Sequence, residues 1–540
     1  MAILASQATR RDAKSYFGRF GKDLYPKTQG RDQSSGNTAK GLSKRIHIAV
    51  VKVCQADTLC SVDVLPGLAK TLLQLGRLGM PVCLVIEPED GYMATEPPLS
   101  WSSPALREKY SAMAYRIADA IEAQGGRAQP ILGEFLSQTD PTTSTSQVTD
   151  GTQSEIAQDV ERSILRPPVT LAPAAKKLLH DLMKRSQIPI VAPIAGGVMP
   201  SLLPISADCA MYRICQGFSL ADENSETSAI TIARVIIVDP IGGLPAPERR
   251  AGSHIYINLR QEYDRMIDEL TSGLLVPQET RLTAATKLHL RNLILVKMCL
   301  ASLNPTSSGL ITTPAIASAT ASESKPQSLI HNLLTDKPLI SPSLPRRRLT
   351  TPISDTTLLR TGLPVAIYQS IDESEDKKSA IDYERLVRLI EDSFGRRLDS
   401  DHYRNRIREK TAAIIVVGDY EGAAIVTKES GASSPPDTWV PYLDKFAVST
   451  KSQGSGGVAD IVFNVLVSLF PNDLIWRSRR NNPVNKWVCN FSVPHDLNSL
   501  TTVLRASARD MATARDSLES FLDIHRYQSG QVRELCRYYL

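Results

Sequence analysis

The sequence predicts an α/β domain built on a parallel sheet, followed by an α+β domain built on a mixed sheet. Residues 45–87 form a strand, helix, strand pattern with short connections, which is typical of a parallel sheet. Residues 442–448 form a strand pattern that leads through a glycine-rich turn into the helical pattern of residues 458–469. Residues 344–357 lie between these regions and combine prolines, an arginine triplet and polar residues, which indicates a domain linker.

The composition is that of a globular protein with several domains. The chain has 540 residues, of which 42% are hydrophobic and 22% charged, and its net charge is only +5. This charge does not indicate nucleic-acid binding, and no apolar run reaches the roughly 18 residues of a membrane span, so we expect neither partner. The eight cysteines form no C-x-x-C pair, which favours buried thiols and predicts no metal site.

Residues 1–44 have the composition of a mitochondrial transit peptide. Basic residues outnumber acidic ones by nine to three there, Ser and Thr are frequent, and a secretory apolar core is missing. A disordered basic tail is the alternative. We expect ordered structure to begin at Arg45, and a first domain to span residues 45–343.

Further apolar runs extend the predicted first domain. Residues 188–195 and 234–238 predict additional strands, and residues 289–303 predict an apolar helix in the core. Residues 137–153 and 315–327 are low in complexity, so we expect flexible surface insertions there.

The second predicted domain spans residues 358–540. Its patterns follow the order strand, two helices, three antiparallel strands, helix and strand. Residues 381–394 form an amphipathic helix pattern that ends at Gly395, a typical C-cap residue. Residues 411–428 predict a hairpin, and residues 512–525 predict a helix close to the C-terminus.

The glycine turn is the first candidate binding site. Lys451, Gly454 and Gly456 follow a basic-x-x-G-x-G spacing directly before a helix. Glycines allow backbone N–H groups to gather around one point, and a helix N-terminus adds partial positive charge, so the turn suits a diphosphate. The alternative is an ordinary cap and turn, which is the commoner origin of such a pattern.

Basic residues flank this turn. Lys445 lies near the end of the preceding strand, and Arg477 and Arg479 lie two apart in the strand-like run 474–488, so both point to one face. An exposed basic edge strand is the alternative interpretation of this run.

Three segments carry a specific resemblance: YLDKFAV (442–448), QGSGGVADIVFN (453–464) and WRSRRNNPVNKW (476–487). They resemble the acetyltransferase domain of the fungal mitochondrial N-acetylglutamate synthases, also called amino-acid acetyltransferases, and the resemblance extends over nearly the whole chain. It implies an amino-acid-kinase-like parallel-sheet sandwich followed by a GCN5-related acetyltransferase domain. In that second fold two central strands splay apart and acetyl-CoA lies in the opening.

The resemblance implies transfer of an acetyl group from acetyl-CoA to L-glutamate, the first step of L-arginine biosynthesis, in the mitochondrial matrix. It also implies inhibition by L-arginine, a homotetramer, and a complex with acetylglutamate kinase. Glutamate has two carboxylates, which need several fixed cations, best supplied by bidentate arginines. By motif these are Lys445, Arg477, Arg479 and Arg396, although Arg397 is adjacent to the last.

The resemblance also assigns the co-substrate site. The backbone of Phe446, Ala447 and Val448 is expected to pair with the pantetheine arm, and Phe446 also lines the acceptor site. The diphosphate is expected to bind at five consecutive residues: Gln453, Gly454, Ser455, Gly456 and Gly457.

Proton transfer is where the chain departs from this family. Relatives carry a tyrosine after the tryptophan that matches Trp487, and it is the favoured acid for the CoA thiolate; here the position is Val488, which cannot donate a proton. Losing a general acid costs about tenfold to a thousandfold in rate. Asn482 is the candidate catalytic residue, orienting the amine or a water, and a turn residue before Pro483 is the alternative.

The first domain departs from active amino-acid kinases. Lys52 is followed by Val53, Cys54 and Gln55 instead of glycines, and the second strand ends at Glu87 beside further acids, which would repel a phosphate. We therefore expect that this domain is not a kinase, and the resemblance implies a regulatory and oligomerising role instead. These departures leave one alternative function, a catalytically weak or inactive regulatory subunit that binds arginine and acetylglutamate kinase.

Overall fold

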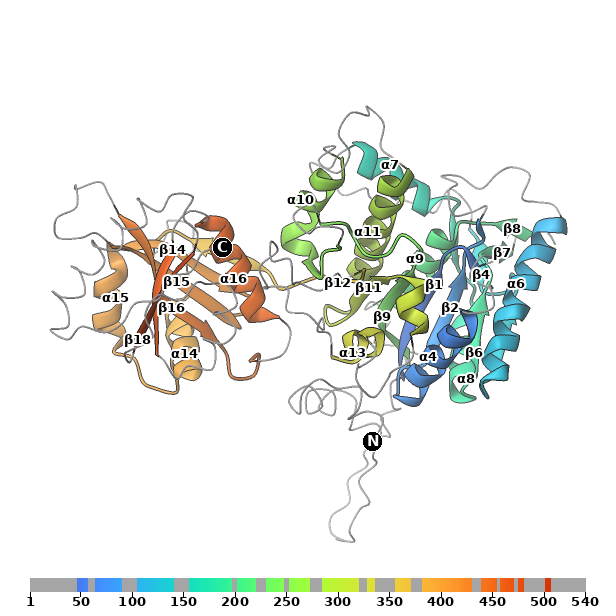
Figure 1. The fold of residues 1–540 in the computed structure, drawn as a ribbon, viewed down its shortest axis with the longest axis horizontal. Coiled ribbons are helices and arrows are strands. Elements are labelled where there is room, and N and C mark those ends of the chain that lie inside the picture. The colour runs from blue at the N-terminus through green and yellow to red at the C-terminus, as the bar shows by residue number, and fades with distance from the viewer. Residues whose placement is uncertain are drawn as a thin grey trace, which may run out of the picture. The chain divides into compact units, whose positions relative to one another are not determined.

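The computed structural model describes the following residues: 46–56, 64–89, 104–139, 155–196, 202–219, 230–246, 252–271, 284–319, 328–335, 355–370, 381–429, 439–453, 457–470, 474–479 and 501–506. They form two compact units that divide between Gly362 and Leu363 (Figure 1). The predicted transit peptide and the predicted helix 512–525 lie outside the described residues.

The first unit is an α/β sandwich. Its strands are β1 (Ile46–Val53), β2 (Val82–Ile86), β3 (Ala128–Ile131), β4 (Leu136–Gln138), β5 (Val169–Leu171), β6 (Ile188–Val191), β7 (Ile194–Gly196), β8 (Leu202–Pro204), β9 (Ile230–Val238), β10 (Tyr256–Asn258), β11 (Ser308–Thr312) and β12 (Thr357–Arg360). Its helices are α4 (Leu65–Arg77), α6 (Pro104–Ala123), α7 (Glu155–Leu165), α8 (Ala175–Lys184), α9 (Ala207–Gly217), α10 (Leu259–Thr271), α11 (Ala284–Ser302), α12 (Pro314–Ser318) and α13 (Ser328–Thr335).

Eight of these strands form one sheet in the order β10-β12-β11-β9-β1-β2-β6-β3. The central strands β9, β1, β2 and β6 pair in parallel, which confirms the predicted parallel sheet. Only the β11–β12 pair is antiparallel among the described pairs of this sheet. Four short strands form a second sheet in the order β5-β4-β7-β8.

Helices cover both faces of the large sheet. Ile48 and Val50 of β1 pack on one face against a core that includes α9, α10 and α11. Ala49 and Val51 pack on the other face, against α4 and α6. This central parallel strand is therefore buried on both sides, which explains why residues 48–51 form a continuous apolar run instead of an alternating one.

The structure differs from the sequence prediction at three places in the first unit. The run 188–195 is split between β6 and β7 of different sheets, with Pro193 between them. The start of the supposed flexible segment 315–327 belongs to α12, whose N-cap Thr313 accepts a hydrogen bond from Ile316 N at 3.3 Å. Strand β12 pairs with β11, so the first unit continues past the predicted linker.

The second unit contains a six-stranded sheet in the order β13-β14-β15-β16-β17-β18. Its strands are β13 (Val365–Tyr368), β14 (Thr411–Val417), β15 (Gly422–Glu429), β16 (Val440–Val448), β17 (Leu474–Arg479) and β18 (Thr501–Ala506). Its helices are α14 (Tyr383–Phe394), α15 (Ser400–Arg408) and α16 (Val458–Leu469). The predicted order of elements is confirmed, and β18 is an additional strand.

Two separate apolar cores hold this sheet. Leu386 and Ile390 of α14 and Ile407 of α15 pack on one face. Val462 and Leu466 of α16 pack on the other. The chain thus places α14 and α15 opposite α16, with the central strands between them.

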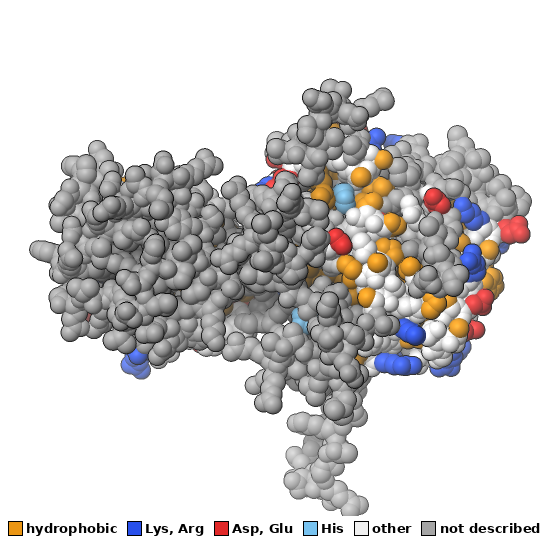
Figure 2. Space-filling model, in the orientation of Figure 1, with side chains coloured by type: hydrophobic (Ala, Val, Ile, Leu, Met, Phe, Trp, Pro, Cys, Tyr) orange, Lys and Arg blue, Asp and Glu red, His pale blue; other side chains and the backbone are white. Residues whose placement is uncertain are grey.

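The surface of the first unit mixes charges of both signs. On the face drawn in Figure 2, Lys and Arg side chains alternate with Asp and Glu side chains and with apolar ones. In the part of the chain that the structure describes, no helix combines the length and apolar character needed to cross a membrane.

Candidate active site

The strands β16 and β17 lie side by side over a very short distance. Both run in the same direction, yet they pair at only two positions, Tyr442 with Ile475 and Leu443 with Trp476. Strand β16 continues to Val448, where it pairs with β15 alone among the described strands. The strands therefore separate beyond Leu443, and that acetyl-CoA lies in this opening stays a prediction.

The end of strand β16 is hydrogen-bonded to helix α14 as well as to the chain before β15. Val448 N donates to Ser393 Oγ of α14 at 3.1 Å, whereas the next amide, Ser449 N, donates to Glu421 O at 2.9 Å. The Val448 amide is thus outside the β15 ladder. Phe446 is partly buried and packs its side chain against the α16 core; that its backbone lines the acceptor site stays a prediction.

The turn before α16 is described at its two ends, residues 451–453 and Gly457. Gly457 is the N-cap of α16 in the left-handed conformation, with φ of 67°, and no side chain caps the helix. A Cβ at Gly422 of β15 would lie 2.5 Å from Val458 Cγ1, so the first turn of α16 packs closely on the sheet. Gln453 Nε2 donates to Val448 O at 3.1 Å and ties the turn to the strand. Gly454, Ser455 and Gly456 lie outside the described residues, so the diphosphate site stays a prediction.

A β-bulge shapes β16 at the predicted acceptor residue. Ile425 pairs with Lys445 and Val426 pairs with Leu443, so Asp444 is an extra residue without a partner in β15. A bulge breaks the strict alternation of side chains along a strand. Lys445 Nζ consequently reaches the carboxylate of its own neighbour, 3.0 Å from Asp444 Oδ2.

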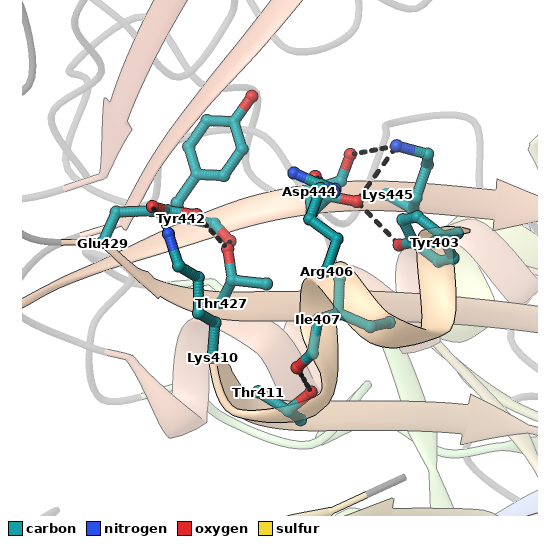
Figure 3. Close-up of polar contacts among 10 residues, drawn as sticks. All are labelled: Tyr403, Arg406, Ile407, Lys410, Thr411, Thr427, Glu429, Tyr442, Asp444 and Lys445. Atoms are coloured by element: carbon teal, nitrogen blue, oxygen red, sulfur yellow. Dashed lines mark hydrogen bonds and ion pairs between the residues drawn. The ribbon is translucent and has the colours of Figure 1, made fainter. Parts of the chain in front are cut away.

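Helix α15 adds two side chains that the sequence analysis did not identify (Figure 3). Tyr403 Oη donates to Asp444 Oδ2 at 2.7 Å, and Arg406 Nη2 contacts Asp444 Oδ1. Lys445 Nζ also lies 5.1 Å from the centre of the Tyr403 ring. The sequence signal was the spacing of three between Tyr403 and Arg406, which places both on one face of a helix.

The charges of this cluster shift the acidity of its members. Burial by itself raises the pKa of Asp444, but Lys445, Arg406 and the hydrogen bonds lower it by more, so its pKa lies below the ordinary value. Burial and the Asp444 carboxylate raise the pKa of Tyr403. Asp444 is therefore ionised and Tyr403 is a neutral donor at neutral pH.

Acid is expected to weaken the second unit through Asp444. Because its folded-state pKa is lowered, its stabilising contribution is present above the unfolded-state pKa of about 3.9 and is lost as pH falls through the folded-state value. Below about pH 4 the wild type should lose this contribution, whereas Asp444→Asn has no carboxylate to protonate at this position. The difference between their free energies of unfolding should therefore become smaller. Tryptophan fluorescence in urea would measure it, since Trp439, Trp476 and Trp487 belong to this unit. A difference that stays constant down to pH 2.5 would contradict the expectation.

The structure describes only some of the remaining predicted substrate-binding and catalytic residues. Arg396 and Arg397 are both exposed and directly follow Gly395, which caps α14 with φ of 63° as predicted. The backbone of Arg477 and Arg479 lies in β17, opposite Val503 and Thr501 of β18. Asn482, Trp487 and Val488 lie outside the described residues.

The first unit has a buried charge cluster at the carboxyl ends of β1 and β2. Lys52 Nζ lies 3.0 Å from Glu87 Oε2 and also contacts Asp208 of α9. Arg291 of α11 lies 3.0 Å from both Glu87 Oε1 and Asp208 Oδ2. No side chain of this group of four is more than 13% exposed.

The ion pairs of this cluster reduce the repulsion that Glu87 was expected to exert on a phosphate. Two cations neutralise two carboxylates inside the protein, so Glu87 is not presented to a phosphate as a bare charge. Burial by itself raises the pKa of Asp208, but Arg291 and Lys52 lower it by more, to below its ordinary value. That the unit is not a kinase stays a prediction.

The sequence comparisons give consistent relatives. A family model described as the N-acetyltransferase domain of N-acetylglutamate synthase matches residues 370–524. A curated protein of Yarrowia lipolytica, named mitochondrial amino-acid acetyltransferase, is 33% identical over 561 aligned residues, which cover 90% of this chain and 85% of the relative. A protein of Aspergillus oryzae with the same name is 33% identical over 596 aligned residues and covers 90% and 82%.

Solved structures are more distant. N-acetylglutamate synthase of Neisseria gonorrhoeae, complexed with coenzyme A and N-acetyl-glutamate, is 13% identical to this chain, with a TM-score of 0.42. The match covers 89% of this chain and 94% of that one.

Proposed function

Because the chain belongs to the family of mitochondrial amino-acid acetyltransferases, we propose that it transfers the acetyl group of acetyl-CoA to the α-amine of L-glutamate. The chain is an N-acetyltransferase, and acetyl-CoA is its acetyl donor. The mitochondrial location predicted from residues 1–44 is confirmed by its relatives. The glutamate acceptor, the matrix location and the control by arginine are proposals.

The main support for glutamate as the acceptor is the set of cationic side chains near the point where β16 and β17 separate. Lys445 and Arg406 surround one carboxylate, Asp444, so the described cluster keeps a net positive charge of one unit. An acceptor with two carboxylates is attracted to such a site, whereas the amine of a protein lysine is repelled. Arg477, Arg479 and Arg396 supply the further cations in this proposal.

In the proposed reaction the chain binds and orients its two substrates. Lys445 and the arginines hold the glutamate carboxylates, the backbone of residues 446–448 holds the pantetheine arm, and residues 453–457 hold the diphosphate. The amine lone pair then forms a bond to the thioester carbonyl carbon, and the C–S bond breaks with its electron pair on sulfur. Bringing amine and thioester together removes much of the entropic barrier, so no covalent enzyme intermediate is required.

Two protons move in this reaction: the amine loses one and the CoA thiolate gains one. We propose that Asn482 orients the amine or a water during the first transfer. Val488 leaves the second transfer to water or to another side chain.

The first unit has the regulatory role in this proposal. It would bind L-arginine as an inhibitor and join the chain to other copies, as a tetramer, and to acetylglutamate kinase. Val488 and the missing glycines after Lys52 favour a second candidate, a regulatory subunit with little or no catalysis.

The test is CoA release by the full purified chain with acetyl-CoA and one acceptor at a time. We expect release with L-glutamate and at least tenfold less with L-glutamine, which lacks the second carboxylate. L-Arginine should lower the rate with L-glutamate. Acetyl-CoA binding without release for any amino acid would overturn the synthase proposal and favour the regulatory subunit.

A further inference from the structure

The carboxylate of Asp444 lies at the centre of a polar cluster in the second unit (Figure 3). Only 5% of its side chain is exposed. Oδ2 accepts from Tyr403 Oη at 2.7 Å and from Lys445 Nζ at 3.0 Å, and Oδ1 is bound by Arg406. A buried carboxylate with this many partners is an anchor with one well-defined orientation.

Lys445 depends on this anchor more than Arg406 does. The Lys445 side chain is 25% exposed and the Arg406 side chain is 40% exposed. A lysine ammonium is a point charge on a flexible four-carbon stem, so its position is set by its partners. In the described cluster these are the Asp444 carboxylate, the Asp444 backbone carbonyl at 3.4 Å and the face of the Tyr403 ring.

The bulge makes this contact possible. In a regular strand Asp444 and Lys445 would point to opposite faces of the sheet. The extra residue in β16 removes that alternation where β16 separates from β17. The lysine is therefore fixed at the opening by its sequence neighbour.

We propose that Asp444 is the positioning residue for the glutamate acceptor: it holds Lys445 Nζ in place at the opening between β16 and β17, with Arg406 compensating its charge. The inference rests on the proposed function and deepens it. Asp444 touches neither substrate in this view and acts through Lys445. Arg406 keeps the cluster positive, so the site still attracts a carboxylate.

Asp444→Asn tests the role because it keeps the shape and removes the charge. The amide NH₂ would face a cation, and Lys445 would lose its ion pair. We expect the KM for L-glutamate to rise about 10- to 100-fold, as for the loss of a hydrogen bond to a charged group. The KM for acetyl-CoA should change less than about threefold, which a general loss of structure would not reproduce.

Glu429→Gln is the matched control. Glu429 lies on β15, its side chain is 10% exposed, and it pairs with Lys410 Nζ at 3.2 Å. The change again turns a buried carboxylate into an amide beside a lysine, but away from Lys445. It should not raise the KM for L-glutamate selectively.

Tyr403→Phe provides a second variant in case Asp444→Asn does not fold. It removes only the hydroxyl and should raise the KM for L-glutamate about 2- to 10-fold. Suppose that the wild type releases CoA with L-glutamate and that the variant that folds has an unchanged or lower KM for L-glutamate. This result would overturn the role of Asp444 but not the proposed function. A wild type without glutamate-dependent release would overturn the proposed function as well.

Discussion

Lys445→Ala is expected to lower kcat/KM for L-glutamate by about 30- to 3,000-fold. Truncating one member of a close charge pair in a binding site costs about 2–5 kcal/mol, and each 1.4 kcal/mol is a factor of ten. The effect should exceed that of Asp444→Asn, because Lys445 itself contacts the acceptor in the proposed site. Steady-state release of CoA at varied L-glutamate measures it.

The variant should remain folded. Asp444 keeps Arg406 and the Tyr403 hydroxyl as partners, so no buried charge is left alone. Lys428→Ala is the control: it removes an exposed lysine of the neighbouring strand β15, whose Nζ lies 5.6 Å from the centre of the Trp439 ring. A Lys445→Ala enzyme with the wild-type kcat/KM would exclude Lys445 as an acceptor ligand.

Lys52→Met is expected to destabilise the first unit by about 3–5 kcal/mol. Lys52 is fully buried, and the change leaves Glu87 and Asp208 with Arg291 as their only cation in the described cluster. Breaking a buried ion pair is costly because the remaining charge has lost its solvation. Hydrogen exchange of peptides from β1 and β2 would report this unit separately from the second.

Lys70→Met is its control, since Lys70 lies exposed on α4 and the change should alter stability by less than about 0.5 kcal/mol. If the β1 amides of Lys52→Met are as well protected from hydrogen exchange as those of the wild type, Arg291 alone balances the charges of both carboxylates. In that case the cluster would not be the element that holds the ends of β1 and β2 together.

Local sequence patterns were sufficient to predict helices whose signals lie within their own residues and caps. Helix α14 was predicted because its apolar period ends at Gly395, and Gly395 does adopt the left-handed C-cap conformation. Helix α16 was predicted to within its observed ends, Val458–Leu469, since its first turn follows a glycine and its apolar residues keep a helical period.

Features that depend on distant partners were not predictable from the sequence. The resemblance named Lys445, but the partners of Lys445 come from α15 and from a bulge whose register is set by β15. Arg291 was predicted only as part of a core helix, although it pairs with Asp208 and with Glu87, which lies 204 residues earlier in the chain. Ion pairs between elements require the topology, which no local pattern contains.

The bulge at Asp444 also limits how this segment can change during evolution. Asp444 is the residue that the bulge adds, so a strand without it could keep Leu443 opposite Val426 and Lys445 opposite Ile425. Deleting another residue of β16 would instead shift the pairing by one position and turn the side chains on one side of the gap to the opposite face. The bulge is therefore the place where this strand can change its length without rebuilding the sheet, and a deletion there removes the carboxylate that contacts Lys445.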